Sequence, residues 1–219
     1  MKDLYLILDV DGTLVDYNGE KDIIVPRSGL GQFLAHCFKC FAVVGIWTAA
    51  DQSWYDRVYK EVLKQHLPDQ KEFAFVLTGT RCSTMAESNG GIYPRHIKVK
   101  PLKKFWQSLL VPSSENLKGI ETLTLQRPNR HNTLIVDDTP GTYQLNYGNA
   151  VPIKSFDCFD QSVDQELEKL TVYMTDVLIP ESKSKGSIRY LEKRNWSKST
   201  TLDSAGTDLL AVVPEEIAN

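Results

Sequence analysis

The sequence has few cysteines, no long hydrophobic run and no excess of basic charge, and each absence excludes a class of protein. Four cysteines scattered over 219 residues are too few for a disulfide framework. The longest apolar stretch, residues 41–47, is far shorter than the ~20 residues of a membrane span. The formal net charge of −3 gives no overall field that would draw nucleic acid. We therefore expect an intracellular protein, cytoplasmic or nuclear, with no signal peptide, no membrane helix and no strong nucleic-acid binding.

Composition and length are typical of a folded globular chain. Hydrophobic residues make up 42% and charged residues 24% of the sequence. The length suits one domain with an insertion or a tail better than two full domains. We expect a main domain over residues 1–178 with an insertion at about 79–98. A helical extension over 179–198, with its helix at 187–196, and a flexible tail over 199–219 are expected to follow.

Apolar runs alternate with helical patterns along the chain. Four runs are typical of strands buried on both faces of a parallel sheet: 4–10, 41–48, 73–78 and 133–138. Helices are predicted between them, at 29–39, from Asp51 onward, and at 102–110. This alternation predicts an α/β fold with a doubly wound, Rossmann-like parallel sheet. Ligands of such sheets bind outside the carboxyl ends of the strands.

Cys37 and Cys40 form a closely spaced pair that has two interpretations. A zinc or redox site would need a second such pair, but Cys82 and Cys158 stand alone, and only His36 lies nearby. Buried structural thiols are the favoured interpretation.

Asp9 and Asp11 follow the first predicted strand, in a segment Asp-Val-Asp-Gly-Thr that ends at Thr13. Carboxylates at alternate positions of an extended chain face the same way and repel each other. The pair therefore favours a bound cation. The alternative is an Asp-Gly turn that only leads the chain out of the sheet.

A second acidic pair, Asp137 and Asp138, follows the fourth apolar run. Two strands that end in acidic pairs at one sheet edge gather four carboxylates around one site. Mg²⁺ is the cation that best fits such oxygen ligands, so we predict it as the cofactor. The candidate metal ligands are Asp9, Asp11, Asp137 and Asp138.

Thr48 and Lys100 have the properties of a phosphate site. Thr48 ends the second apolar run and offers a hydroxyl and a backbone N–H close to a predicted helix start. Lys100 precedes Pro101 and the next helix and supplies a positive charge. Each residue also has an ordinary structural interpretation, as a helix N-cap and as a surface lysine.

The sequence resembles the haloacid-dehalogenase-type phosphatases, and within them the FCP/SCP-like family of RNA polymerase II carboxyl-terminal-domain (CTD) phosphatases, also called NLI-interacting-factor-like. The resemblance covers about residues 4–175. The segments that carry it are LDVDGTLVD, VPRSGLGQFL, GIWTAADQSWYDRV, VKPL and LIVDDTPGTYQLNYGNAVPIKSF. Gly12 stands where the family usually has glutamate or another larger residue. The resemblance implies a haloacid dehalogenase-type fold.

The sequence is too short for a cap domain both before and after Thr48. The interval from Thr13 to Thr48 is filled by a turn, a helix and a strand, and beyond Thr48 only the insertion at 79–98 remains, which is the size of a hairpin. We expect a capless site. Such a site cannot select a small metabolite by enclosure, so it favours a substrate with its own surface.

The resemblance implies a mechanism. Asp9 attacks the phosphorus and forms an aspartyl-phosphate, while Asp11 protonates the leaving oxygen and later activates water. Asp138, aided by Asp137, holds Mg²⁺ together with the Asp11 backbone carbonyl. Which of the two acids ligates directly is left open. The residues assigned to catalysis are Asp9, Asp11, Thr48 and Lys100, and those assigned to substrate binding are Thr13, Thr48, Trp54 and Lys100.

Three functions are open at this point. The first is a Mg²⁺-dependent phosphatase of phosphoserine and phosphothreonine in proteins, such as the RNA polymerase II CTD. The second is a capless polynucleotide 3′-phosphatase or small-phosphoester phosphatase. The third is a non-catalytic phosphoprotein-binding module, which the presence of Asp9 and Asp11 disfavours.

Trp54 also has two interpretations. By the family's spacing, it falls where an aromatic residue lines the substrate groove. It also begins an apolar stripe with Val58 and Val62 and fits a place in the core equally well.

Overall fold

The computed structural model describes residues 3–87, 95–107, 126–146 and 148–199. Its centre is a five-stranded sheet in the order β5-β4-β1-β8-β9, in which every pair of neighbours is parallel. The strands are β1 (Tyr5–Leu8), β4 (Val43–Trp47), β5 (Val76–Leu77), β8 (Thr133–Asp137) and β9 (Ala150–Pro152). The predicted α/β fold with a doubly wound parallel sheet is confirmed. The third apolar run, 73–78, forms only the two-residue strand β5, and β9 was not predicted.

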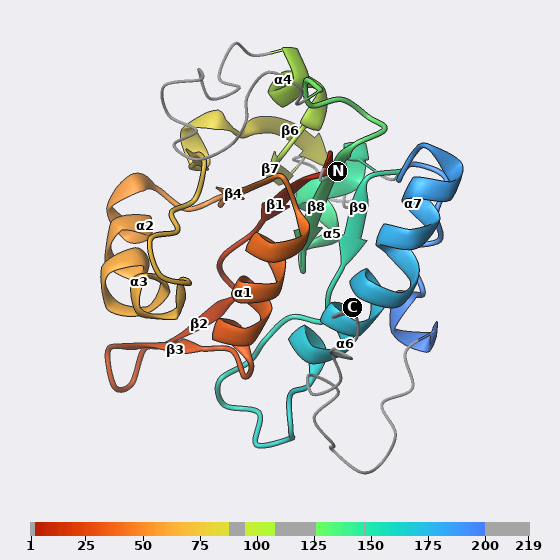
Figure 1. The fold of residues 1–219 in the computed structure, drawn as a ribbon. Coiled ribbons are helices and arrows are strands. Elements are labelled where there is room, and N and C mark those ends of the chain that lie inside the picture. The colour runs from red at the N-terminus through yellow and green to blue at the C-terminus, as the bar shows by residue number, and fades with distance from the viewer. Residues whose placement is uncertain (1–2, 88–94, 108–125, 147, 200–219) are drawn as a thin grey trace, which may run out of the picture.

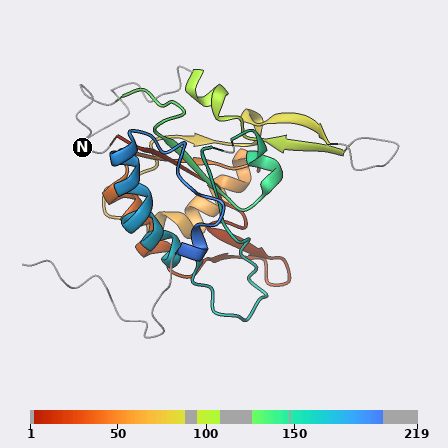
Figure 2. The ribbon, with the colours of Figure 1, turned by 90° about the vertical axis from the view of Figure 1, so that its right-hand side faces the viewer.

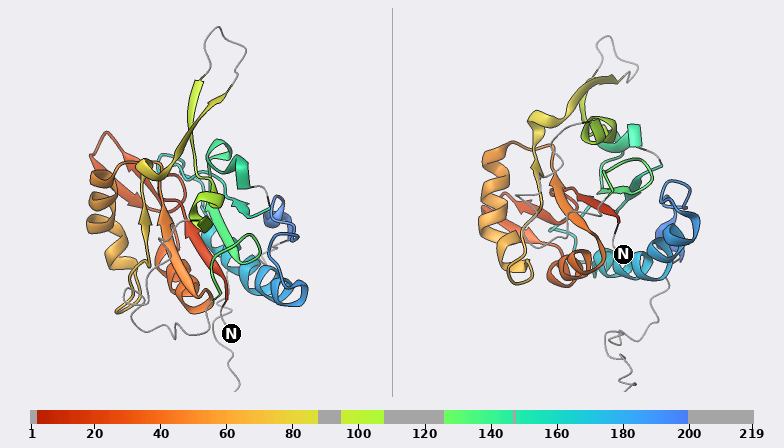
Figure 3. Two further views of the ribbon diagram at one scale, coloured as in Figure 1. Left: turned by 90° about the horizontal axis from the view of Figure 1, so that it is seen from above. Right: turned by 45° about the horizontal axis from the view of Figure 1, so that its top comes forward.

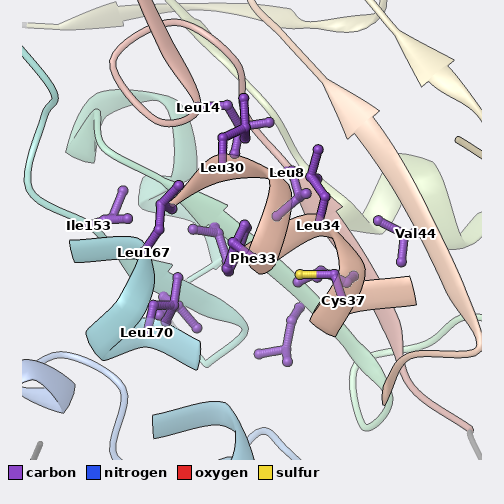
Figure 4. Packing of buried hydrophobic residues seen from close by; sticks show 14 of the residues in the cluster. Leu8, Leu14, Leu30, Phe33, Leu34, Cys37, Val44, Ile153, Leu167 and Leu170 are labelled. Carbon is purple, nitrogen blue, oxygen red and sulfur yellow. The ribbon is translucent and has the colours of Figure 1, made fainter. Parts of the chain in front are cut away.

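Helices cover both faces of the sheet because the strand residues alternate in direction. Leu6 and Leu8 of β1 belong to the larger core with α1 (Leu30–Cys40) and α6 (Glu166–Tyr173). Ile7 faces a second core with α4 (Leu102–Gln107) and α5 (Pro140–Tyr143). Figure 1 shows α1 and α6 side by side on one face. Figure 4 shows the buried side chains of that core, with Phe33 and Cys37 of α1 among them.

The predicted helices are present with shifted ends. The helix predicted at 29–39 is α1. The helix after Asp51 consists of α2 (Gln52–Val58), a π-helical stretch (Tyr59–Leu63) and α3 (Lys64–His66). Asp51 caps it, because its carboxylate accepts a hydrogen bond from the N–H of Trp54 at 2.8 Å. The predicted 102–110 helix is α4 as far as Gln107, and its last three positions lie outside the described residues.

Two antiparallel hairpins flank the sheet. The expected hairpin in the insertion is β6 (Ser83–Glu87) paired with β7 (Arg95–Val99), and it projects from the body of the molecule (Figures 2 and 3). A second hairpin, β2 (Val15–Asn18) with β3 (Ile23–Pro26), lies between Thr13 and α1 and was not predicted. Both are hairpins of short strands, so the prediction of a capless site agrees with what is described.

The C-terminal helix is not where it was expected. One helical run extends from α6 through a π-helical stretch (Met174–Leu178) to α7 (Ile179–Lys185), across the expected boundary at residue 178. The predicted helix at 187–196 is wrong: that segment consists of turns until a 3₁₀ turn at Trp196–Ser199. Its backbone bonds elsewhere, because Ile188 donates to the carbonyl of His131 at 3.0 Å. Of the tail expected over 199–219, residue 199 ends this 3₁₀ turn, and residues 200–219 lie outside the described residues.

None of the described helices is both long and apolar enough to cross a bilayer.

Candidate active site

The strand register brings the predicted acids to one edge of the sheet. Leu8, the last residue of β1, pairs with Ile46 of β4 on one side and with Val136 of β8 on the other. The next residues are Asp9, directly after β1, and Asp137, the last residue of β8, which therefore lie side by side at the carboxyl ends of the two strands. The geometry of a doubly wound sheet thus places the site where ligands of this architecture bind.

Lys100 lies between two acids in the buried centre of the site. Its Nζ is 2.7 Å from Asp9 Oδ1 and 2.7 Å from Asp137 Oδ2. The side chains of Lys100 and Asp137 are fully buried, and that of Asp9 is 7% exposed. At this depth the ammonium group is shielded from water, so these charge-assisted hydrogen bonds are strong.

The environment of this centre raises the pKa values of Asp9 and Lys100. Burial raises the pKa of Asp9 well above its ordinary value, Lys100 opposes that shift, and Asp137 adds to it. Burial lowers the pKa of Lys100, but Asp9 and Asp137 outweigh burial, and the net shift is upward. Lys100 therefore stays charged, and one cation faces two acids. The centre is short of positive charge.

Backbone contacts hold Lys100 in this position. Its N–H donates to the carbonyl of Thr142 at 2.7 Å, and its carbonyl accepts from Asn146 Nδ2 at 2.6 Å. Asn146 Oδ1 in turn accepts from the N–H of Leu102 at 3.0 Å, at the start of α4. Thr142 and Asn146, which follow β8, thereby hold the backbone of Lys100, which precedes α4.

Asp9, Asp137 and Asp138 form a cluster that fits a metal ion. One carboxylate oxygen of each lies within 4.8 Å of the others. An all-oxygen donor set beside a centre short of positive charge suits Mg²⁺. Gly12 allows the close approach of Asp138: its φ is 72°, and a Cβ atom there would lie 2.4 Å from Asp138 Oδ2. A larger residue at this position would displace Asp138.

Asp11 has other partners and is not part of this cluster. Its Oδ2 accepts a hydrogen bond from the Thr48 hydroxyl at 3.2 Å, and its Oδ1 accepts one from Trp54 Nε1 at 2.6 Å. The two carboxylates of the first motif thus have different partners. Asp9 contacts Lys100, whereas Asp11 contacts Thr48 and Trp54, and we call these three residues, Asp11, Thr48 and Trp54, with the side chains packed on them, the rim of the site. Asp11 therefore lies two residues from Asp9 with its carboxylate at the edge of the site, where a side chain can give or take a proton.

Trp54 connects the site to the β2–β3 hairpin. Its ring meets that of Tyr17 on β2 edge-on, with centroids 5.3 Å apart. The Arg57 guanidinium lies over both rings, at 5.8 Å from Trp54 and 5.7 Å from Tyr17. Trp54 is half-buried and packs against the core as well. The core interpretation of Trp54 therefore holds in part, its place in a substrate groove stays a prediction, and the bond to Asp11 was not anticipated.

Arg27 stabilises the loop of the first motif, residues 9–13, and this role was not predicted from the sequence. Its buried guanidinium donates to the carbonyls of Thr13 at 3.2 Å and Lys154 at 2.8 Å, and it pairs with Asp164 at 2.9 Å. Thr13 itself is fully buried, and its hydroxyl has no hydrogen-bond partner among the described residues. Arg27 thus ties the loop that carries Asp11 to the segment after β9.

The model of the NLI interacting factor-like phosphatase family matches residues 4–185. The chain belongs to this family. The resemblance inferred from the sequence motifs is confirmed, and the family accounts for the α/β fold of the haloacid dehalogenase type.

Two curated relatives of this family member are ubiquitin-like domain-containing CTD phosphatase 1 from Danio rerio and from Xenopus tropicalis. The chain is 28% identical to the first over 176 residues, which is 78% of this chain and 49% of the relative. It is 26% identical to the second over 197 residues, 86% of this chain and 55% of the relative. The chain thus spans about half the length of the curated relatives that it matches.

Among solved structures, the family member is similar to the fission yeast RNA polymerase II CTD phosphatase Fcp1 bound to beryllium fluoride. The TM-score is 0.42 and the identity 15%, over 88% of this chain and 58% of that chain.

Of the site residues predicted from the sequence, the structure brings Asp9, Lys100, Asp137 and Asp138 together, with Asp11, Thr48 and Trp54 at the rim. Cys37 is buried in the core, and no metal-ligating cluster of the described residues includes it or Cys40. Arg27 and Tyr17 were missed because their roles depend on partners distant in sequence. The segment VPRSGLGQFL contains Arg27, so the motif was a signal for it.

Proposed function

We propose that this protein is a Mg²⁺-dependent phosphatase that removes phosphate from phosphoserine and phosphothreonine of proteins through an aspartyl-phosphate on Asp9. The observation that carries the proposal is the division between a buried centre, in which Lys100 holds Asp9, and a rim, where Asp11 is anchored by Thr48 and Trp54. A nucleophile and a separate acid–base group beside a cluster of metal-binding acids are the parts that this reaction needs.

The chain's own residues have separate tasks in this proposal. Asp9 attacks in line, and its phosphorus–oxygen bond forms as the bond to the leaving serine oxygen breaks. Asp11 gives that oxygen a proton, then takes one from the water that hydrolyses the aspartyl-phosphate and releases inorganic phosphate. Thr48 and Lys100 face the phosphoryl oxygens, and Thr13 supports the loop. Asp9, Asp137, Asp138 and the Asp11 carbonyl would hold Mg²⁺, which would supply positive charge to offset the dianionic substrate.

The proposed substrate is a phosphoprotein. Only short hairpins flank the site among the described residues, so the surface beside Asp11 is open to a protein segment. The relatives carry the name CTD phosphatase, which makes the RNA polymerase II CTD the first substrate to test and supports a nuclear or cytoplasmic location as part of the proposal.

A substrate panel with metal control tests the proposal. An aryl phosphate, phosphoserine and phosphothreonine peptides of the CTD repeat, and a 3′-phosphorylated oligonucleotide are assayed with Mg²⁺ and with excess chelator. We expect hydrolysis of the aryl phosphate and the peptides that stops with chelator and returns with Mg²⁺. Turnover of the oligonucleotide alone would favour the polynucleotide phosphatase, and undiminished activity in chelator would rule out the proposed site.

A further inference from the structure

The insertion forms hydrogen bonds with the loop that begins at Thr48. Three successive carbonyls of this loop accept hydrogen bonds from the segment 79–98. The Ala50 carbonyl accepts from the N–H of Gly79 at 2.6 Å, and the Ala49 carbonyl accepts from Lys98 Nζ at 2.7 Å. The Thr48 carbonyl has a longer contact, 3.9 Å, with the Cys82 thiol. The conformation of this loop therefore depends on the base of the insertion hairpin.

Lys98 is the charged member of these three contacts. It lies near the end of β7, two positions before Lys100, and its side chain is exposed. An ammonium donor makes a stronger bond than the neutral N–H or the thiol. Lys98 belongs to β7, whereas Lys100 follows the end of that strand. Lys100 enters the centre, whereas Lys98 reaches the loop.

A chain of hydrogen bonds leads from Lys98 to Asp11. The Ala49 carbonyl and the Ala50 N–H belong to one peptide group, so the ammonium on the oxygen polarises the N–H on the other side. The Ala50 N–H donates to Thr48 Oγ1 at 3.0 Å, and the Thr48 hydroxyl donates to Asp11 Oδ2 at 3.2 Å. Lys98 thus acts on the direction in which the Thr48 hydroxyl points.

We propose that Lys98 is a positioning residue that orients the Thr48 hydroxyl through the Ala49–Ala50 peptide and so couples the insertion hairpin to the site. Its effect on turnover rests on the proposed function, whereas its effect on the loop does not. Lys98 touches none of the candidate metal ligands, and Gly79 next to it has no room for a side chain: a Cβ there would lie 2.5 Å from the Ala49 carbonyl oxygen.

Kinetics of matched lysine variants test the coupling. Lys98→Met is expected to lower kcat/KM for an aryl phosphate about tenfold, because Thr48 loses its orientation. Lys98→Arg keeps a charged donor and should remain within about threefold of the wild type. Lys104→Met is the control: Lys104 is also exposed and bonds within the same region, to Ser83 Oγ at 2.6 Å, but it does not contact the loop. Equal kinetics in all three variants would overturn the proposal.

Amide hydrogen exchange tests the same coupling without any substrate. In Lys98→Met, the Ala50 N–H should exchange about tenfold faster than in the wild type. The Ile46 N–H in β4, which donates to Phe75 at 3.0 Å, should not change. If the wild type hydrolyses no phosphate but Ala50 responds, the proposed function fails and the positioning role stands. If Ala50 is unaffected, or if Ala50 responds while an active enzyme keeps its kinetics, the positioning role is wrong.

Gly79→Ala provides a second route to the same result. The added methyl group would lie 2.5 Å from the Ala49 carbonyl oxygen and 2.8 Å from Lys98 Nζ, so it should separate the two without removing the lysine and reproduce both the faster exchange of Ala50 and the loss in kcat/KM. Wild-type behaviour of Gly79→Ala together with wild-type exchange in Lys98→Met would overturn the proposal.

Discussion

The centre and the rim of the site use charge in opposite ways. In the centre, Lys100 is fully buried between Asp9 and Asp137. At the rim, Arg57 pairs with Asp22 and Glu61, and its side chain is 32% exposed. Water screens the rim charges, so each of those pairs contributes little to stability. The central charges lack that screening, so each depends on its partners.

This difference separates two tasks in the proposed function. In the centre, a cation would offset the shortage of positive charge. At the rim, Asp11 accepts hydrogen bonds from the Trp54 indole N–H and the buried Thr48 hydroxyl, and the Trp54–Tyr17 aromatic pair is proposed to contact an incoming protein segment. Substitutions in the centre should therefore affect every substrate equally, whereas substitutions at the rim should distinguish one substrate from another.

The largest expected effect is that of Asp9→Asn. Loss of the nucleophile should reduce turnover of every phosphate ester by on the order of 10⁴-fold or more. In the presence of chelator, by contrast, the free energy of unfolding of Asp9→Asn should be higher than that of the wild type. Burial raises the folded-state pKa of Asp9, so the wild type loses stability as pH rises through that pKa, and asparagine does not.

Chemical unfolding as a function of pH measures this second effect. The advantage of Asp9→Asn over the wild type should grow with rising pH and vanish below the unfolded-state pKa of about 4. An advantage that grows as pH falls would contradict the assignment of a raised pKa to Asp9.

Lys100→Met tests the dependence of the centre on its cation. Two buried carboxylates would lose their cationic partner, so the free energy of unfolding should fall by about 3–5 kcal/mol. Arg57→Met is the rim control and should cost less than about 1 kcal/mol, because its ion pairs are exposed. Urea unfolding in chelator gives both values. Similar losses in the two variants would remove the distinction between centre and rim.

Asp11→Asn should show the substrate dependence of a proton donor. A phosphoserine peptide needs its leaving oxygen protonated, so kcat/KM should fall by about 10²–10⁴-fold. An aryl oxide leaves with little help, and the loss on an aryl phosphate should be much smaller. Steady-state kinetics on both substrates decide the point, and equal losses would contradict the acid–base assignment.

The sequence predicts the centre better than the rim, for physical reasons. Strands buried on both faces must be continuously apolar, so β1, β4 and β8 were recognisable, and their shared direction brings Asp9 and Asp137 to one edge. The helical run after Glu166 was overlooked, although Leu167, Leu170, Met174 and Leu178 repeat at helical spacing. That signal was available in the pattern.

The contacts that were missed join segments far apart along the chain. Nothing in the sequence around Arg27 indicates that it is buried. Its bonds to Thr13, Lys154 and Asp164 explain the burial. The segment 187–196 has helical composition. It forms turns because Lys193 Nζ donates to the carbonyls of Ile188 and Leu191 while the neighbouring side chains enter the core. Local propensity cannot anticipate such tertiary bonds.

Trp54 carries the smallest effect and tests the rim most sharply, because it performs two tasks that different substitutions separate. Trp54→Phe removes the N–H that bonds Asp11 but keeps a ring against Tyr17, and it should lower kcat a few-fold on all substrates. Trp54→Ala also removes the aromatic surface and should cost phosphopeptides roughly a further tenfold in kcat/KM. Trp106→Phe is the control, since the buried Nε1 of Trp106 has no hydrogen-bond partner among the described residues.

Kinetics on an aryl phosphate and on a phosphopeptide, with the melting temperature of each variant, separate these tasks. If Trp54→Phe behaves as Trp106→Phe does, the bond to Asp11 has no role in turnover. If Trp54→Ala loses both activities equally and melts several degrees lower, the ring serves the core alone. Selectivity for proteins would then depend on other residues at the rim, such as Tyr17, which is 38% exposed and whose ring contacts that of Trp54.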